Sequence, residues 1–139
     1  MTEPLQVEVV VTIRAPQESV FDAWVSPDRM ARFLCAFDSH VSAITVDPRV
    51  GGAFRIVMSS ARGDVEHRGR YLEIARPDRI RFAWISPATN NEETEVTVTF
   101  DRIGHETRVT LVHIGLADEQ QRQRHRGGWQ SILEKLQAA

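Results

Sequence analysis

The chain opens with an alternation of apolar and polar side chains. Every second residue over 7–13 is apolar, as in a strand with one buried face. Pro16 suits the first turn of a helix, and the apolar residues that follow it recur at helical spacing. This pattern predicts a short helix over 16–24 and a second one over 28–33.

Six further segments alternate in the same way. They cover residues 41–46, 54–58, 65–74, 80–84, 96–100 and 109–113. Turn signals such as Gly51-Gly52 and Pro77-Asp78 separate neighbouring segments. Because a turn reverses the chain after each segment, the pattern predicts antiparallel strands in a meander. Gly69 marks a bulge or a close approach of two backbones.

From about Ala117 the spacing becomes helical again. Apolar residues three and four positions apart predict one helix of ~20 residues that presents Trp129 to the core. The pair Gly127-Gly128 lies in the middle of this helix and costs it about 2 kcal/mol of propensity. We therefore expect a close approach of the helix to the sheet or to a ligand at this pair.

The order of elements predicts an α+β fold in a single domain over 1–139. Seven strands at about 4.8 Å spacing span about 34 Å, whereas one helix is only ~10 Å across. The seven-stranded antiparallel sheet must therefore curl around the long C-terminal helix. Two short helices between the first and second strands would close one end and leave interior volume.

Composition and charge narrow the class of protein. A chain of 139 residues is the size of one ordinary domain, and its net charge of −2 provides no field that would attract nucleic acid or an anionic membrane. A single cysteine, Cys35, excludes an intrachain disulfide. No apolar stretch approaches the ~20 residues of a membrane helix, and the N-terminus lacks a signal pattern. We expect a cytoplasmic protein without membrane insertion.

Several motifs together resemble the helix-grip (START/Bet v 1-like, SRPBCC) superfamily, and more narrowly its branch related to the activator of Hsp90 ATPase. The motifs are Arg14-Ala15-Pro16 with Val20-Phe21 and Trp24, Gly51-Gly52-Ala53-Phe54, Gly69-Arg70-Tyr71-Leu72-Glu73, Pro77-Asp78-Arg79-Ile80, Thr107-Arg108-Val109-Thr110-Leu111, and His125-Arg126-Gly127-Gly128-Trp129. The resemblance covers about Val7 to Leu136. One departure follows Arg32, where the family commonly has two tryptophans and Gly-Pro but this chain has Phe33-Leu34-Cys35-Ala36.

The predicted inward faces and the resemblance together suggest a ligand pocket. Its candidate residues are Trp24, Phe54, Met58, Tyr71, Phe82, Trp84, Val98, Phe100, Leu111, His113, His125 and Trp129. The alternative for each aromatic residue is simple core packing. His113 and His125 could be polar anchors or an acid/base pair, or they could be histidines satisfied by backbone or water.

No motif indicates a metal or a cofactor. His67, His113, His125 and Cys35 are the potential metal ligands, but no close pair of histidines or cysteines exists among them. Gly51-Gly52 lacks the spacing and the following lysine of a phosphate-binding loop. We therefore expect neither a metal nor a cofactor.

Three functions remain, in this order. The first is binding or carriage of a small hydrophobic or amphipathic ligand. The second is an enzyme acting on such a molecule in the same pocket. The third is an Hsp90 effector, which ranks last because the family members that activate Hsp90 carry a further N-terminal domain. We also expect a homodimer, since Val10, Val112 and Ile114 would form an apolar patch on the outer face of the sheet.

Overall fold

The computed structural model describes residues 5–138 of the chain. Its elements are β1 (Val7–Ile13), α1 (Gln17–Ala23), α2 (Pro27–Phe33), β2 (His40–Val46), β3 (Ala53–Ser60), β4 (Gly63–Ala75), β5 (Arg79–Trp84), the 3-10 helix η1 (Pro87–Thr89), β6 (Thr94–Ile103), β7 (Glu106–Ile114) and α3 (Glu119–Ala138). The predicted order of strands and helices is confirmed. The 3-10 turn η1 was not predicted.

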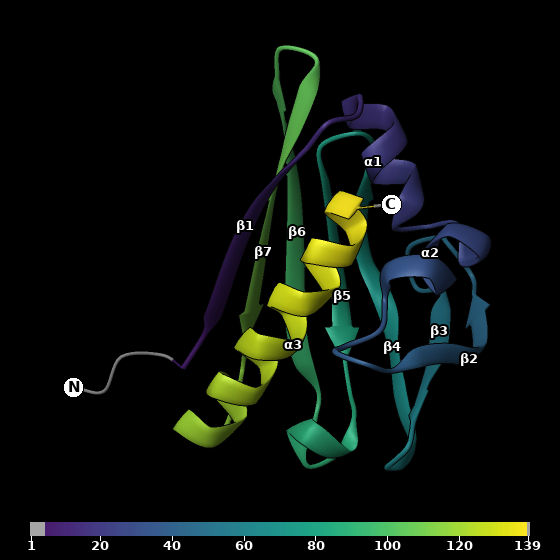
Figure 1. Cartoon of the computed structure of the whole chain (residues 1–139), viewed down its shortest axis with the longest axis vertical. Coiled ribbons are helices and arrows are strands. Elements are labelled where there is room, and N and C mark those ends of the chain that lie inside the picture. Colours follow the sequence, from purple (N-terminus) through teal and green to yellow (C-terminus); the bar gives the residue numbers. More distant parts are fainter. Residues whose placement is uncertain (1–4, 139) are drawn as a thin grey trace.

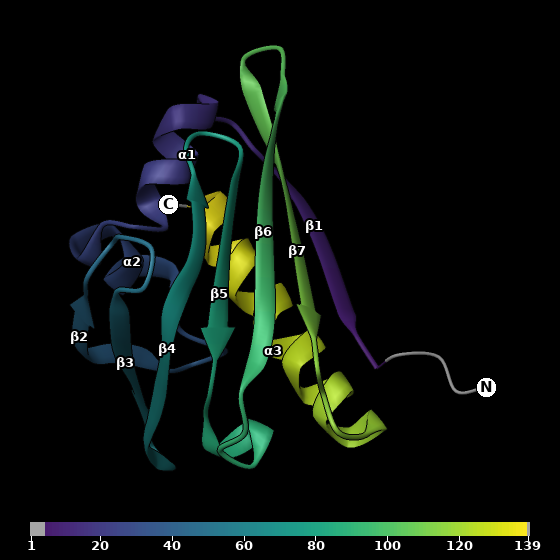
Figure 2. The same cartoon turned by 180° about the vertical axis from the view of Figure 1, so that it is seen from behind.

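The strands form one antiparallel sheet with the order β1-β7-β6-β5-β4-β3-β2. The sheet curls around α3, which crosses its inner face diagonally (Figure 1), whereas the rear view shows the strands alone in front (Figure 2). The first strand therefore lies beside the last one, as the predicted fold requires. This curled sheet gripping one long helix is the expected helix-grip architecture.

The core lies between the inner face of the sheet and α3. Alternate residues of β5, β6 and β7 face each other across the strands, with Ile80 opposite Val98 and Val98 opposite Leu111. From α3, Trp129 and Leu133 are buried against this surface. The apolar residues that recur at helical spacing in α3 thus face the core, as predicted.

The two short helices close one end of the sheet through aromatic contacts. Phe21 of α1 packs edge-on against Phe100, with ring centroids 5.3 Å apart. Trp24 packs in the same way against Phe33 of α2 at 5.1 Å. Both arrangements are the favoured geometry of aromatic pairs, and they fix this helical corner to the sheet.

Two glycine predictions have different outcomes. A side chain at Gly69 would collide with the Ala83 carbonyl oxygen and the Phe54 ring, so the predicted close approach is confirmed. The expectation of a tight helix–sheet contact at Gly128 is wrong, because its neighbour is Ala36 in the segment after α2. A Cβ at position 128 would lie 3.7 Å from the Ala36 Cβ, which is an ordinary contact.

Candidate functional site

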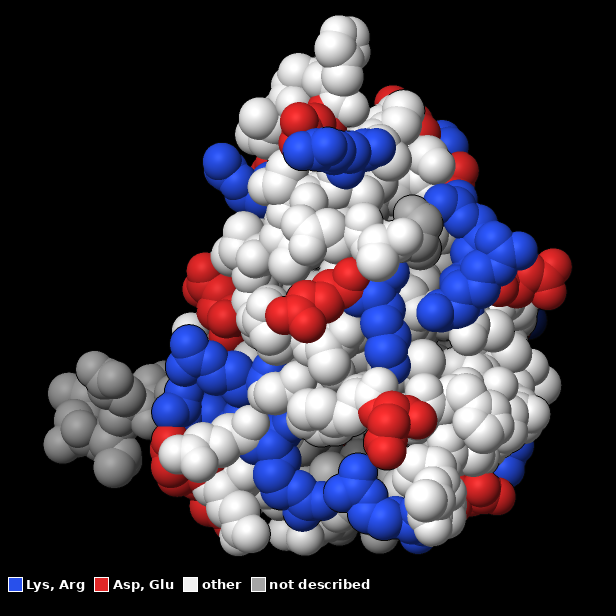
Figure 3. Space-filling model, in the orientation of Figure 1, with Lys and Arg blue, Asp and Glu red and all other residues white. Residues whose placement is uncertain are grey.

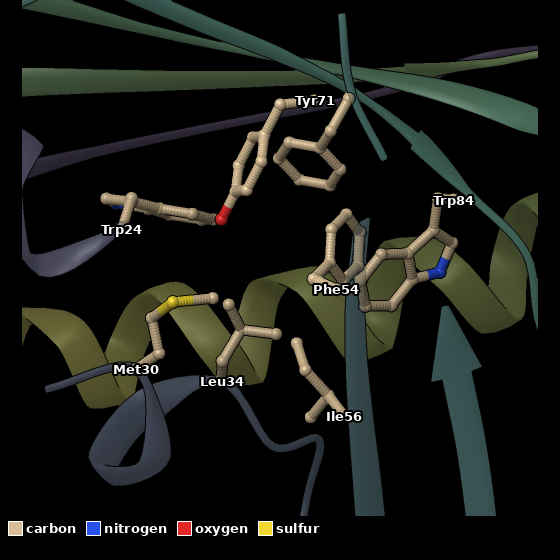
Figure 4. A pocket seen from close by; sticks show the side chains of 8 residues that line it. Trp24, Met30, Leu34, Phe54, Ile56, Tyr71 and Trp84 are labelled. Carbon is tan, nitrogen blue, oxygen red and sulfur yellow. The ribbon is translucent and has the colours of Figure 1, made fainter. Parts of the chain in front are cut away.

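The interior between α2 and the sheet is almost filled by side chains. A void of only about 10 Å³ remains there, and it is lined by Trp24, Met30, Leu34, Phe54, Ile56, Tyr71, Phe82 and Trp84. Figure 4 shows these side chains converging, with the Tyr71 hydroxyl directed toward the Trp24 ring. This volume is about that of one water molecule. As it stands, the void has no room for an organic ligand.

A much larger hollow lies beside this packed region. It measures about 430 Å³ and is bounded by α3, by residues 36–39 after α2, by the β3–β4 hairpin and by η1. We call it the groove. Its floor is largely apolar and includes Met58, Trp84, Trp129 and Ile132. Its polar lining residues are Asp38, Ser39, Ser60, Arg62, His67, Gln123, Arg124 and His125.

Two tryptophans form the centre of the groove floor. Trp84 comes from the end of β5 and Trp129 from the middle of α3, and their ring centroids are 5.0 Å apart. His67 of β4 also packs against Trp84, with ring centroids 5.0 Å apart. Trp84 lines both the groove and the small void, and therefore separates them.

His113 is buried behind this floor and does not line the groove. The Trp129 indole N–H donates to His113 Nδ1 at 3.0 Å, so Nδ1 accepts and Nε2 carries the proton. Nε2 donates to Thr94 Oγ1 at 2.7 Å, and Thr94 Oγ1 donates to the Trp84 carbonyl at 2.6 Å. Burial lowers the pKa of His113 to about 3. Protein atoms therefore occupy both ring nitrogens of His113, so this geometry does not support the expectation that His113 anchors a ligand.

His125 lies on the groove side of the same cluster. Its Nδ1 donates to the Gln121 carbonyl one turn earlier in α3, at 2.7 Å. Its ring meets His113 edge to face, with centroids 4.8 Å apart. Burial lowers the pKa of His125 below its usual value, which favours the neutral ring. Among the described residues, Nε2 has no hydrogen-bond partner, so it offers a lone pair.

His67 is a groove residue that sequence reasoning considered only as a possible metal ligand. It is 9% exposed, and its Nδ1 is buried without a hydrogen-bond partner among the described residues. Burial lowers the pKa of His67 to about 4. Alternation along β4 could have revealed it, because His67 and Tyr71 lie an even number of residues apart and both face inward.

The segment after α2 forms one wall of the groove and is anchored to α3. Lys135 Nζ donates to the carbonyls of Cys35 and Phe37, both at 2.6 Å. The Phe37 N–H donates to Ser131 Oγ at 3.0 Å. Phe37 has a φ of 55° and remains 57% exposed at the groove. An aromatic residue is unusual in that conformation, and these three hydrogen bonds hold it there.

Charged side chains surround the entrance. Arg62 of the β3–β4 hairpin lies 3.6 Å from Asp38, so this exposed ion pair joins two walls of the groove. Arg124 provides a further exposed cation on α3. Figure 3 shows basic side chains interspersed with acidic ones around the lower part of this face. The groove thus has an apolar floor and a charged entrance.

The twelve predicted pocket residues fall into three groups. Met58, Trp84, His125 and Trp129 line the groove. Trp24, Phe54, Tyr71 and Phe82 surround the small void with Trp84. Val98, Phe100, Leu111 and His113 are buried in the core and line neither space. The structure therefore brings together only part of the predicted set.

Over residues 5–138, no three histidine, cysteine, aspartate or glutamate side chains gather as they would around a metal ion. Cys35 is buried, with its sulfur 3.5 Å from Lys135 Nζ. No helix in the described part is long and apolar enough to cross a membrane.

Comparisons with known proteins match this fold over nearly its whole length. A family model described as "Activator of Hsp90 ATPase homolog 1-like protein" matches residues 14–139. No curated protein matches the chain. Among solved structures, a protein from Chromobacterium violaceum superposes with a TM-score of 0.88 and 24% identity, covering 98% of this chain and 96% of that one. The AHSA1 protein from Silicibacter pomeroyi gives a TM-score of 0.81 and 26% identity, covering 96% and 95%.

Proposed function

Because the chain belongs to the activator of Hsp90 ATPase homolog 1-like family, we propose that it uses the helix-grip fold to bind a small hydrophobic or amphipathic ligand in the groove. The observation that carries this proposal is the open volume of about 430 Å³ above the Trp84–Trp129 floor. Small-molecule sites typically measure about 300–1,000 Å³ and combine apolar walls with a few polar groups.

The distribution of polar groups supports an amphipathic ligand. The floor offers aromatic surface for an apolar body, and two uncharged imidazoles lie beside it. Arg62, Asp38 and Arg124 are at the entrance, where water still solvates them. A molecule with an apolar body and a polar end fits this arrangement, in which an apolar floor lies below a charged entrance.

Binding is supported better than catalysis. An acid/base pair would need a titratable group near neutral pH, whereas burial lowers the pKa of both groove histidines. The nearest contacts of His125 are a backbone carbonyl and the His113 ring. Neither contact is a nucleophile or an orienting carboxylate. The groove geometry therefore favours a carrier or sensor over an enzyme.

A fluorescence screen tests this proposal. The groove contains two of the three tryptophans, so a bound ligand should change their emission. We would titrate fatty acids, sterols and small aromatics and expect saturable binding at micromolar concentrations. Absence of binding up to the solubility limit of every class would contradict the proposal.

Two matched variants locate the binding. Gly128→Leu places a side chain in the groove and should weaken binding at least tenfold. Gln130→Leu places the same leucine side chain at an exposed position of the same helix, outside the groove, and should leave binding unchanged. Equal affinity in both variants would place the ligand elsewhere. Purified Hsp90 serves as a separate assay, in which saturable stimulation of ATP turnover would favour the chaperone alternative.

A further inference from the structure

Resting on the proposed function, we propose that the groove selects a neutral head group that donates a hydrogen bond, such as a phenol or an alcohol, and that His125 Nε2 is its acceptor. His67 lines the groove beside Trp84 and adds a second uncharged ring to the floor. A ligand whose polar end is a carboxylate would be discriminated against at the floor.

The role of His125 follows from its fixed tautomer. A backbone carbonyl can only accept a hydrogen bond. The 2.7 Å contact between His125 Nδ1 and the Gln121 carbonyl therefore means that the proton is on Nδ1. In the neutral ring Nε2 then carries only a lone pair. His125 lines the groove, and its Nε2 has no hydrogen-bond partner among the described residues. A ligand with a hydrogen-bond donor can therefore bind to this atom.

His67 is a second imidazole that lines the groove. Its Nδ1 is enclosed by protein atoms, so His67 contributes ring surface rather than a hydrogen bond. His67 contacts Trp84, Trp84 contacts Trp129, and His125 lies close to the His113–Trp129 contact. Both imidazoles therefore lie close to the aromatic floor formed by Trp84 and Trp129.

The charges in the groove argue against an anion at the floor. Both imidazoles are held neutral by burial, and the lone pair of His125 Nε2 would repel a carboxylate. The available cations, Arg62 and Arg124, are exposed at the entrance, and Arg62 is already next to Asp38. An ionised group would remain at the entrance, whereas a neutral donor can reach the floor.

Isothermal titration with three naphthalene probes at pH 7 tests the selectivity. 1-Naphthol has the donor, 1-methoxynaphthalene keeps the oxygen without the proton, and 1-naphthoate carries a negative charge. We expect naphthol to bind about tenfold more tightly than the ether and more tightly than naphthoate. A single satisfied hydrogen bond accounts for a ratio of this size.

Two variants assign the acceptor. His125→Phe keeps an aromatic ring without the lone pair, so naphthol should lose about tenfold in affinity while the ether is unchanged. His125→Gln restores a carbonyl oxygen and should recover part of the preference. Equal binding of naphthol and ether to the wild type, tightest binding of naphthoate, or an unchanged preference in His125→Phe would each overturn the inference while leaving the groove a ligand site. If none of the three probes binds, the inference fails, whereas the proposed function fails only if the fluorescence screen also finds no ligand in any class.

Discussion

At the scale of single residues, a chain of hydrogen bonds decides which histidine is available. Trp129, His113, Thr94 and the Trp84 carbonyl satisfy one another completely. His125, only 4.8 Å away, keeps one nitrogen open. Sequence alternation placed His113 on the inner face, but it could not show that Trp129 and Thr94 occupy its two nitrogens, because those partners are 16 and 19 residues away.

Substitution of Thr94 tests this chain of hydrogen bonds. Thr94→Val keeps the shape but leaves the His113 N–H without its acceptor, and should lower the free energy of unfolding by about 1–3 kcal/mol. Urea denaturation measures the loss. Thr97→Val, on the outward face of the same strand, should change stability by less than about 0.5 kcal/mol. Equal effects of the two variants would contradict the buried network.

The buried histidines also predict a dependence of stability on pH. The pKa of His113 is lowered to about 3 and that of His67 to about 4, so the unfolded chain binds protons that the folded protein excludes. The folded protein therefore keeps its full stability above about pH 6.5, and its free energy of unfolding decreases as the pH falls below that value. His113 and His67 together give a slope of about 2.5 kcal/mol per pH unit near pH 5.5. His125, whose pKa burial also lowers, adds to this slope in the same direction.

Urea denaturation between pH 7 and pH 5 measures this slope in a range where carboxyl groups contribute little. His67→Phe removes one of these groups and should reduce the slope by about 1.2 kcal/mol per pH unit. A stability that stays flat over this range would show that these imidazoles are not excluded from protonation.

At the scale of elements, the periodicity of the sequence predicted every helix and strand except the short turn η1. The segment after α2 was harder, because its conformation depends on Lys135, which is 98 to 100 residues away from the groups that it binds. Gly69 and Gly128 also could not be interpreted fully from the sequence. Each lies inside a regular element, and only its neighbours from distant parts of the chain show whether a side chain would fit there.

Alanine at these two glycines should therefore act in opposite directions. Gly69→Ala would force the Ala83 carbonyl and the Phe54 ring apart, and should destabilise the protein by about 3 kcal/mol or more. Gly128→Ala adds an ordinary contact with Ala36 and improves helix propensity, and should stabilise it by about 0.5–1 kcal/mol. Thermal unfolding of the pair is the measurement. A destabilising Gly128→Ala would restore the idea of a tight contact there.

At the scale of the whole molecule, self-association remains a prediction. Val10 is 48% and Ile114 is 41% exposed on the outer face of the sheet, with Val112 half-buried between neighbouring strands. We expect a homodimer through this patch that Val112→Glu disrupts. Sedimentation velocity showing a monomer at high micromolar concentration in both proteins would contradict it.

The location of free volume was the least predictable property of the molecule. The order of elements predicted space between helix and sheet, and the inward aromatic residues were correctly placed. Their combined bulk nevertheless leaves a void of only about 10 Å³ near Tyr71 and Phe82. The larger space lies to the side, where α3, residues 36–39, the β3–β4 hairpin and η1 surround it. Alternation identifies which side chains face inward but not how completely they fill the space.

The most direct test of the central claim is a ¹H–¹⁵N NMR titration with 1-naphthol that follows the three indole N–H signals and the backbone amides. Ligand in the groove should shift the indole signals of Trp84 and Trp129 and the amide of Gly128, while the Trp24 indole, buried at the other end of the core, stays in place. Saturable shifts confined to the groove would support the account. Shifts that centre on Trp24 or the outer face of the sheet, or no shifts at all, would contradict it.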